Sequence, residues 1–494
     1  MSFVRIAFLA LISPAICTTA RAAPPDLRPN VIVFLIDELR YDEVDKQTRQ
    51  PFVRLPNIDR LAEEGISFSR FYSVSTICSP NRASLLTGQY PAMHGVVDNT
   101  DRTRLSRFLS TFPHTLQSHG YHTAFIGKWH MGNDATPRPG FDFWSAIPGQ
   151  GQMWNPQIWK DDRLETVQGY VTDVLNDEAL AFLRQPRTGP FLLYLSHKAI
   201  HPDAHQNADS SVDLNFGMRY EAAARHAGRY QDEPVRLPVA AQSFNKNPEG
   251  KPALARAFAR KRSPENVKTW GALLELDAQK DTIRRRAEML LSIDEGIGRI
   301  LEELQRQGQL DNTLIIFTSD NGTNWGEHGL TLERRLPYEE VIHLPLIVYY
   351  KRWLSNGHPR VNDNLTLQID IAPTVLAAAG VESDTTMQGR SLQPLLTGTV
   401  AQWRDSFLIE YQPDERPFSW LLDMSYVAVR QRNLKLIHWL RYPQEAELYD
   451  LANDPYEQHN VIDASAYAAR LPALKKELNR LVLGSRDLLR NTSQ

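Results

Sequence analysis

Cys78 is the residue whose surroundings point most directly to chemistry. It stands in the stretch STICSPNRASLLTG. Ser79 can cap a helix and Pro80 fits a first helical turn, so a helix is predicted to begin right after Cys78 and to end at Gly88. Residue 78 would then lie at the positive end of a helix dipole, one turn from Arg82. That position suits an oxyanion and is expected to lower the pKa of the thiol.

Charged and amide side chains follow each of four apolar runs that are predicted to be buried parallel strands. The strands are expected at about residues 31–36, 122–126, 191–196 and 314–318. The polar residues after them are, in chain order, Asp37 and Glu38, Lys128 and His130, His197 and His201, and Asp320 and Asn321. Ligands of open α/β sheets bind outside the carboxyl ends of the strands. The sequence therefore predicts that four distant segments form one site at one edge of a sheet.

Helical patterns separate these strands, which predicts the α/β class. PNIDRLAEEG and DTIRRRAEMLLSIDEGIGRILEELQRQG are both helical patterns that stop at glycine. Such alternation predicts a large, mostly parallel sheet with helices on both faces. Residues 23–380 are expected to form this catalytic domain, with a polar insertion at about 203–283. Residues 381–494 are expected to form a smaller subdomain of short antiparallel strands that ends in a helix at about 466–483.

The first 22 residues have the form of a signal peptide. Arg5 precedes the apolar run Ile6–Ile16, and Ala20-Arg21-Ala22 offers a small-x-small cleavage site. The run is too short to span a bilayer, and no later segment predicts a membrane span. Export to the periplasm or the medium is therefore expected. Cys17 would be lost on cleavage, which leaves one thiol, and an odd cysteine in an exported protein indicates a reactive or intermolecular role.

The composition is that of an ordinary globular protein. The chain is 42% hydrophobic and 23% charged, which is enough to bury a sizeable core. Its 55 Lys and Arg residues against 58 Asp and Glu residues give a net charge of −3. This balance argues against a general polyanion binder, so no nucleic-acid partner is expected and any anion site must be local.

The sequence CSPNRASLLTG resembles the signature of type I sulfatases, which belong to the alkaline-phosphatase superfamily. The further motifs FLIDELRYD, GKWHMG, SHKAIHP, TSDNG, GEHGL…YEE and ELYDLANDPYE occur in the order typical of that family. The resemblance implies an alkaline-phosphatase-like fold. In the family, a separate formylglycine-generating enzyme oxidises the cysteine to Cα-formylglycine, which implies that Cys78 is present to be converted and not to be paired.

The resemblance also implies a metal site. Its expected ligands are Asp37, Glu38, the modified residue 78, Asp320 and Asn321. Oxygen ligands of this kind favour Ca²⁺, or alternatively Mg²⁺, over zinc. Many family members carry Asp where this chain carries Glu38, whose side chain is one methylene longer.

Arg82, Lys128, His130 and His201 match the remaining pocket residues of the family. The implied reaction begins when a hydroxyl of hydrated formylglycine attacks the sulfur of a sulfate ester and forms a covalent sulfate ester. His201 is expected to protonate the departing oxygen. His130 is expected to take the proton of the second hydroxyl, so that sulfate is expelled and the aldehyde returns. Lys128 and Arg82 are expected to hold sulfate and diol oxygens.

Arg334 is a second departure from the family pattern. Relatives usually carry Lys-Arg shortly before Tyr-Glu-Glu, and that lysine binds the scissile sulfate. In GEHGLTLERRLPYEE, Arg334 occupies the matching place. Arginine keeps the charge but stays protonated, so protonation of the leaving group is expected to depend on His201. Within SHKAIHP, His197 is expected to be structural and Lys198 to be solvated.

The favoured function is hydrolysis of an organic sulfate monoester, with a sulfated carbohydrate as the preferred substrate class. Aromatic residues in GQGQMWNPQIW and in the C-terminal region offer faces on which sugar rings stack. Two alternatives stay open. One is a phosphodiester or phosphonate monoester hydrolase of the same superfamily, and the other is a non-catalytic relative that binds sulfated glycans while Cys78 is never converted.

Overall fold

The computed structural model describes residues 28–204, 219–243, 250–261, 276–330, 333–354, 359–400, 402–412 and 423–486. The predicted signal peptide, residues 1–22, and parts of the predicted insertion at 203–283 lie outside these ranges. Across the described ranges, we find no helix whose length and apolar character would let it cross a membrane.

A ten-stranded sheet forms the centre of the molecule. In spatial order its strands are β12 (Val361–Asn362), β2 (Ile66–Phe68), β11 (Leu346–Tyr349), β9 (Thr313–Ser319), β1 (Asn30–Ile36), β8 (Phe191–His197), β4 (His122–Lys128), β5 (Phe143–Ile147), β6 (Gln157–Lys160) and β7 (Arg163–Thr166). The four predicted strands are confirmed as β1, β4, β8 and β9. They are neighbours in the sheet and run parallel, so Val31 pairs with Leu192 on one side and with Leu314 on the other.

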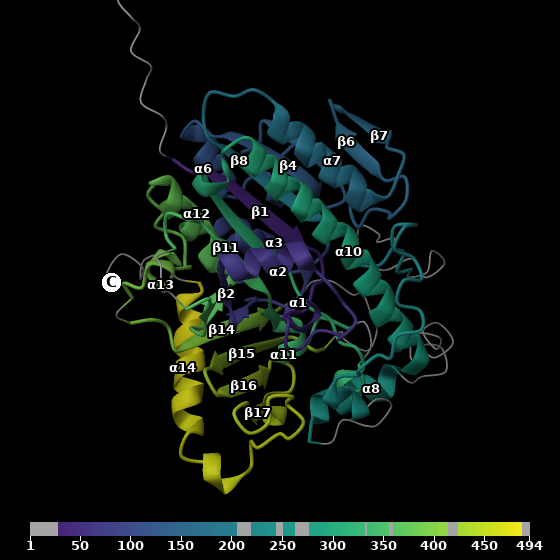
Figure 1. The fold of residues 1–494 in the computed structure, drawn as a ribbon. Coiled ribbons are helices and arrows are strands. Elements are labelled where there is room, and N and C mark those ends of the chain that lie inside the picture. The colour runs from purple at the N-terminus through teal and green to yellow at the C-terminus, as the bar shows by residue number, and fades with distance from the viewer. Residues whose placement is uncertain are drawn as a thin grey trace, which may run out of the picture.

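Side chains of β1 alternate between two buried layers, because successive residues of a strand point to opposite faces. Ile32, Phe34 and Ile36 pack against one group of helices, and Val31 and Val33 pack against another. The first group is α2 (Pro56–Glu64), α7 (Val171–Arg184) and α10 (Leu276–Arg306); the second is α3 (Cys78–Thr87), α6 (Phe112–Ser118), α12 (Ile371–Ala379) and α13 (Gln393–Thr397). Figure 1 shows the long helix α10 running diagonally across the molecule. The predicted α/β fold with helices on both faces is confirmed.

A second sheet of four antiparallel strands lies below the first in Figure 1, beside helix α14. Its elements are β14 (Ser406–Tyr411), β15 (Tyr426–Gln431), β16 (Leu434–Trp439), β17 (Glu447–Asp450) and α14 (Leu471–Gly484). The predicted subdomain boundary at residue 381 stays a prediction. The backbone N–H of Glu410 in β14 donates to the carbonyl of Val74 over 3.0 Å, which ties this sheet to the segment that leads into α3.

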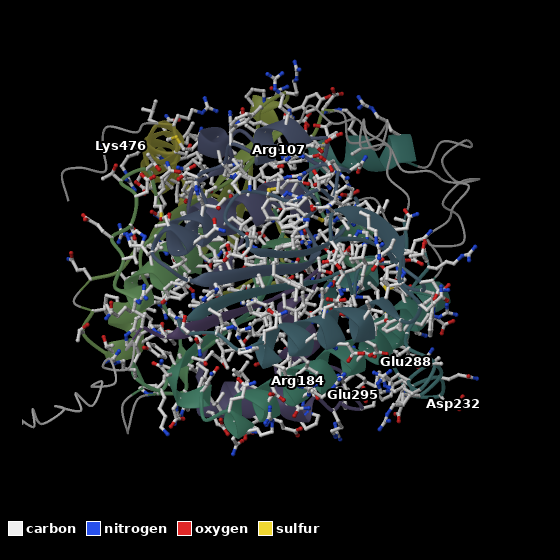
Figure 2. The ribbon with its side chains drawn as sticks, turned by 90° about the horizontal axis from the view of Figure 1, so that it is seen from above. Arg107, Arg184, Asp232, Glu288, Glu295 and Lys476 are labelled. Atoms are coloured by element: carbon white, nitrogen blue, oxygen red, sulfur yellow. The ribbon has the colours of Figure 1, made fainter. Side chains whose placement is uncertain are left out.

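Short elements complete the chain. They are α1 (Tyr41–Val44), α4 (Pro91–His94), α5 (Thr103–Ser106), α8 (Pro252–Lys261), α11 (Glu339–Ile342), the small sheet β10 (His343–Leu344), β3 (Phe71–Tyr72) and β13 (Thr366–Leu367), and the 3₁₀ turns η1 (Val239–Ser243), η3 (Leu310–Asn312), η4 (Glu327–Gly329), η5 (Gln368–Asp370), η6 (Pro443–Glu445) and η7 (Ser465–Tyr467). Figure 2 shows the molecule from above, with Glu288 and Glu295 of α10 and Arg184 of α7 on one side and Lys476 of α14 toward the other.

Gly127 permits the close approach of β4 to β8 directly before Lys128. Its φ is +114°, and a Cβ atom there would lie 1.9 Å from the carbonyl oxygen of Ser196. Residues with a side chain rarely adopt this backbone conformation, and the obstructing atom belongs to the backbone of the neighbouring strand. Glycine is therefore required where these two strands reach the edge of the sheet.

We expect Gly127→Ala to lower the free energy of unfolding by about 3 kcal/mol or more, since it adds backbone strain to a steric clash. Thermal unfolding would measure the loss. The matched control is Gly308→Ala, which has a φ of +69° but no atom within 4 Å of the new Cβ. Strain alone there costs about 1 kcal/mol. Equal losses of unfolding free energy in the two variants would show that the close approach of β4 and β8 adds no cost beyond backbone strain.

Candidate active site

The polar residues that follow the parallel strands meet at one edge of the large sheet. Asp37 follows β1, Asp320 follows β9, and Lys128 is the last residue of β4. The N–H of Glu38 donates to Asp320 Oδ1 over 2.9 Å, which joins the segments after β1 and β9. His201 belongs to the turn after β8, where the N–H of Ile200 donates to the carbonyl of Asp37 over 3.1 Å.

Three potential metal ligands converge at this edge. One donor atom each of Asp37, Cys78 and Asp320 lies within 4.8 Å of the other two, and all three residues are buried. Asp37 Oδ1 and Asn321 Oδ1 are also buried and accept no hydrogen bond from the described residues. Carboxylate and amide oxygens that accept no hydrogen bond suit a hard cation such as Ca²⁺ or Mg²⁺. The donors therefore fit the metal site that the sequence predicted around these residues.

Arg82 bridges the two carboxylates. Its Nε donates to Asp320 Oδ2 over 2.8 Å, and its Nη2 lies 3.3 Å from Asp37 Oδ1. Its Nη1 donates to the backbone carbonyl of Lys128 over 2.6 Å and to Ser196 Oγ over 2.8 Å. One buried guanidinium thus connects helix α3 to four strand ends. Its predicted contact with sulfate or diol oxygens stays a prediction.

Lys128 places a second cation beside Asp37. Its Nζ is hydrogen bonded to Asp37 Oδ2 and to Gln150 Oε1, the latter over 2.6 Å. Burial alone would raise the pKa of Asp37, but Lys128, His201 and Arg82 hold it well below its usual range. Burial and the neighbouring Asp37 raise the pKa of Asp320 to about 6. The neighbouring cations therefore lower the pKa of Asp37 more than that of Asp320, and Asp37 is the more strongly ionised of the two.

Cys78 is the first residue of helix α3, which ends at the left-handed Gly88. The residue preceding the helix is Ile77, so the prediction that Ser79 caps it is wrong; Ser79 Oγ donates instead to the backbone carbonyl of His130. Burial and the carboxylate of Asp320 raise the pKa of the Cys78 thiol to about 12. The expected lowering is therefore wrong as well, because desolvation outweighs the helix dipole.

His201 and Arg334 contact each other. Arg334 Nη2 lies 3.0 Å from His201 Nε2, and His201 Nδ1 lies 2.8 Å from the carbonyl oxygen of Pro202. Burial and Lys128 lower the pKa of His201 well below its usual range. A neutral ring whose Nδ1–H donates to Pro202 leaves Nε2 as the acceptor for Arg334. The imidazole is thereby oriented with Nε2 toward the predicted sulfate-binding arginine.

Glu38 lies against Arg334 and Arg286 and is not part of the grouping of Asp37, Cys78 and Asp320. Its Oε2 is 3.2 Å from Arg334 Nη1, and its Oε1 is 3.5 Å from Arg286 Nη1. Burial raises the pKa of this carboxyl group. Its backbone φ is +64°, which turns the chain sharply between Asp37 and the next helix. Ligation of a metal by Glu38 stays a prediction.

His197 and Lys198, which precede His201 in the motif SHKAIHP, are both buried but make different contacts. The prediction that Lys198 is solvated is wrong, because it is fully buried, with Nζ 3.2 Å from Asp203 Oδ1 and donating to the carbonyl of Pro202 over 2.9 Å. His197 is buried too, and among the described residues its ring nitrogens make no hydrogen bond. Because Ser196 faces Arg82, the next side chain on the strand faces the opposite layer. His197 therefore points away from the candidate site.

Sequence reasoning missed three residues that support the site. Gln150 binds Lys128, Ser196 binds Arg82, and Arg286 binds the carbonyl of Glu38 over 2.6 Å. Gln150 belongs to the stretch that was expected to contact sugar. Arg286 is the last of three consecutive arginines in a helical pattern, and the full burial that distinguishes it from a surface arginine is a result of packing.

Comparison with known proteins agrees with this geometry. The sulfatase family model matches residues 29–381, and a model described as N-sulphoglucosamine sulphohydrolase, C-terminal, matches residues 326–483. The chain is 31% identical to an N-acetylglucosamine-6-O-sulfatase of Bacteroides thetaiotaomicron, with 96% of this chain and 89% of the relative covered. It is 26% identical to PehA of Trinickia caryophylli, a multifunctional alkaline phosphatase superfamily protein, over 90% of this chain and 93% of that one.

A solved structure is also similar over nearly the whole chain. It shows a protein in complex with its substrate D-glucosamine-2-N,6-O-disulfate, and it matches with a TM-score of 0.78 and 28% identity. The match covers 94% of this chain and 100% of the other.

Calcium is expected to stabilise the folded protein if the converging oxygens bind it. Free calcium at about 100 times its Kd would raise the free energy of unfolding by about 2.7 kcal/mol. Thermal unfolding in excess calcium and in chelator measures this gain. Asp37→Asn and Asp320→Asn should abolish most of it, whereas Asp177→Asn on the surface of α7 should keep it. An unchanged gain in both site variants would place the cation elsewhere.

Proposed function

The chain belongs to the sulfatase family of the alkaline-phosphatase superfamily, and from this premise we propose that it hydrolyses the 6-O-sulfate ester of a glucosamine-type sugar. The observation that carries the proposal is the meeting of Cys78, Asp37 and Asp320 at the sheet edge in a chain that matches glucosamine 6-sulfatases over nearly its full length. Its characterised relatives are sulfuric ester hydrolases. The relative crystallised with a 6-O-sulfated glucosamine supports the sugar and the position of the ester.

The metal is assigned to Asp37, Asp320, Asn321 and residue 78, with Ca²⁺ or Mg²⁺ as the ion. When bound, the cation supplies positive charge that favours ionisation of a hydroxyl and offsets the charge of sulfate. Formylglycine made from Cys78 supplies, in its hydrated form, the hydroxyl nucleophile. Arg82 keeps Asp37 and Asp320 in place for this chemistry by bridging them.

Lys128, Arg334, His130 and His201 are assigned to the substrate side. The positive charges of Lys128 and Arg334 act on residue 78, and both raise the local positive potential for a sulfate group. His201 is assigned as the group that protonates the departing sugar oxygen from Nε2. That nitrogen accepts from Arg334 here, so it must first take up a proton, and the negative charge of the bound sulfate ester favours this protonated form. His130, whose backbone is joined to the start of α3 through Ser79, is assigned to accept the proton that accompanies release of sulfate.

Maturation and export complete the proposal. Conversion of Cys78 needs a formylglycine-generating enzyme as a transient partner. Residues 1–22 have the form of a signal peptide, which supports action in the periplasm or outside the cell. Sulfated glycans fragmented by other enzymes would be the source of the substrate in either place.

The phosphonate monoester hydrolase alternative has one specific observation in its favour. PehA, a relative of 26% identity, is described as multifunctional within the alkaline-phosphatase superfamily. The match to 6-O-sulfatases is closer and reaches 31% identity. We therefore rank sulfate ester hydrolysis first and expect any phosphonate activity to be weaker. The non-catalytic alternative is not favoured, because the characterised relatives are hydrolases.

Protein from a host that converts the cysteine should release sulfate from glucosamine 6-O-sulfate, and Cys78→Ala should release no more than the background. Ion chromatography measures the sulfate. Mass spectrometry of the tryptic peptide of residues 71–82 determines whether Cys78 carries an aldehyde or its hydrate. Fully converted protein that cleaves a phosphonate monoester faster than any sulfate ester would reverse the ranking of the two activities.

His201→Ala should reveal general acid catalysis through its dependence on the leaving group. We expect kcat/KM to fall by about 100-fold or more for the sugar ester, whose alkoxide needs a proton, and far less for an aryl sulfate, whose phenolate departs unaided. His122→Ala, an exposed histidine at the start of β4, is the control. Equal losses on the two substrates would assign His201 to binding instead.

A further inference from the structure

Glu38 and Arg334 are the two positions at which the sequence departs from the common family pattern, and in the structure their side chains contact each other. Arg334 Nη1 lies 3.2 Å from Glu38 Oε2, and its Nη2 lies 3.0 Å from His201 Nε2. All three side chains are buried. Glu38 Oε2 also lies 3.5 Å from His201 Nε2. Glu38, Arg334 and the histidine that is assigned to the leaving group therefore form one cluster.

Arg286 holds Glu38 from the opposite side. This fully buried residue of α10 donates to the two carboxylate oxygens of Glu43 over 2.8 and 2.7 Å and to the backbone carbonyl of Glu38 over 2.6 Å. Its Nη1 also lies 3.5 Å from Glu38 Oε1. Arg286 is thus fixed by a bidentate pair, so Glu38 rests against a rigid partner.

The charges in this group balance. Two carboxylates, Glu38 and Glu43, face two guanidinium groups, Arg286 and Arg334. Buried charges are tolerated only when they are paired and hydrogen bonded. The carboxylate of Glu38 is occupied by this pairing and does not belong to the group of donors formed by Asp37, Cys78 and Asp320.

We propose that Glu38 is a positioning residue that, anchored by Arg286, holds Arg334 at the sulfate-binding place, while the metal is held without it. This inference rests on the proposed function, because it takes Arg334 as a sulfate-binding residue. Arginine can do both tasks at once, since its fork presents several N–H groups in fixed directions. A lysine has one nitrogen and could not present the same geometry to Glu38, His201 and sulfate together.

A double-mutant cycle on the calcium-loaded full chain tests the positioning role. The probe is inorganic sulfate, and its Kd is measured by isothermal titration calorimetry. We expect Glu38→Gln to raise this Kd about 10-fold and Arg334→Met to raise it about 100-fold, as the charge-assisted bonds are lost. The double variant should bind no more weakly than Arg334→Met alone.

Two outcomes of the cycle would overturn the proposal. If the fold-increases in the sulfate Kd of the two single variants multiply in the double variant, Glu38 acts independently of Arg334. Tighter sulfate binding by Glu38→Gln would show that Glu38 is only a repelling charge near the anion. Should Glu38→Gln fail to fold, Glu38→Asp keeps the charge and shortens the reach by one methylene, and the same cycle applies. Asp59→Asn, which breaks a pair with Arg49 away from the site, is the control that should leave sulfate binding unchanged.

Calcium affinity supplies the second measurement. We expect Glu38→Gln to change the Kd for Ca²⁺ by less than about threefold, against a rise of about 100-fold or more for Asp37→Asn, which removes a ligand. A rise as large as that of Asp37→Asn would make Glu38 a metal ligand and overturn the proposal. The proposed function fails separately, namely if converted wild-type protein releases no sulfate from any ester, and the binding cycle can still be measured in that case.

Discussion

Two carboxylates that would repel each other in isolation lie side by side in the interior, and the rest of the site depends on the cations that offset them. Asp37 and Asp320 come from strands that are neighbours in the sheet, so the fold forces them together. Arg82 from helix α3 and Lys128 from β4 supply the compensating charge. Helix α3 is in turn the element that begins with Cys78. Charge balance between the strands therefore helps to fix where Cys78 lies.

The candidate site takes its acids and its cations from different segments of the chain. Acids follow β1 and β9, while the cations come from β4, from α3 and from the loop that carries Arg334. A net charge of −3 for the whole chain conveys nothing of this division. The similarity of the chain to an N-acetylglucosamine-6-O-sulfatase and to a solved structure that holds a sulfated glucosamine agrees with a site for anion chemistry.

Much of the fold was predictable because strands that are buried on both faces appear in the sequence as continuous apolar runs. Much of the site was predictable because the residues that follow those runs lie at one edge of the sheet. The predictions that were wrong concerned properties that depend on packing. Lys198 was expected in solvent, because the sequence alone does not show that folding buries its side chain in an ion pair with Asp203. The thiol of Cys78 was assigned a lowered pKa from its helix, but burial determines the direction. Gln150 and Arg286 act through contacts across long stretches of chain.

The position of β1 in the sheet also sets the order in which this protein can fold during synthesis. β1 is the first strand of the described residues, and its partners β8 and β9 follow about 160 and about 280 residues later. At roughly 5–20 residues per second, about 8–32 s pass before β8 is made, and the apolar strand NVIVFLI has no partner strand on either edge during that time. A chain built in this way depends on protection from aggregation while it is made, and the central strand of its finished core is the segment that needs it longest.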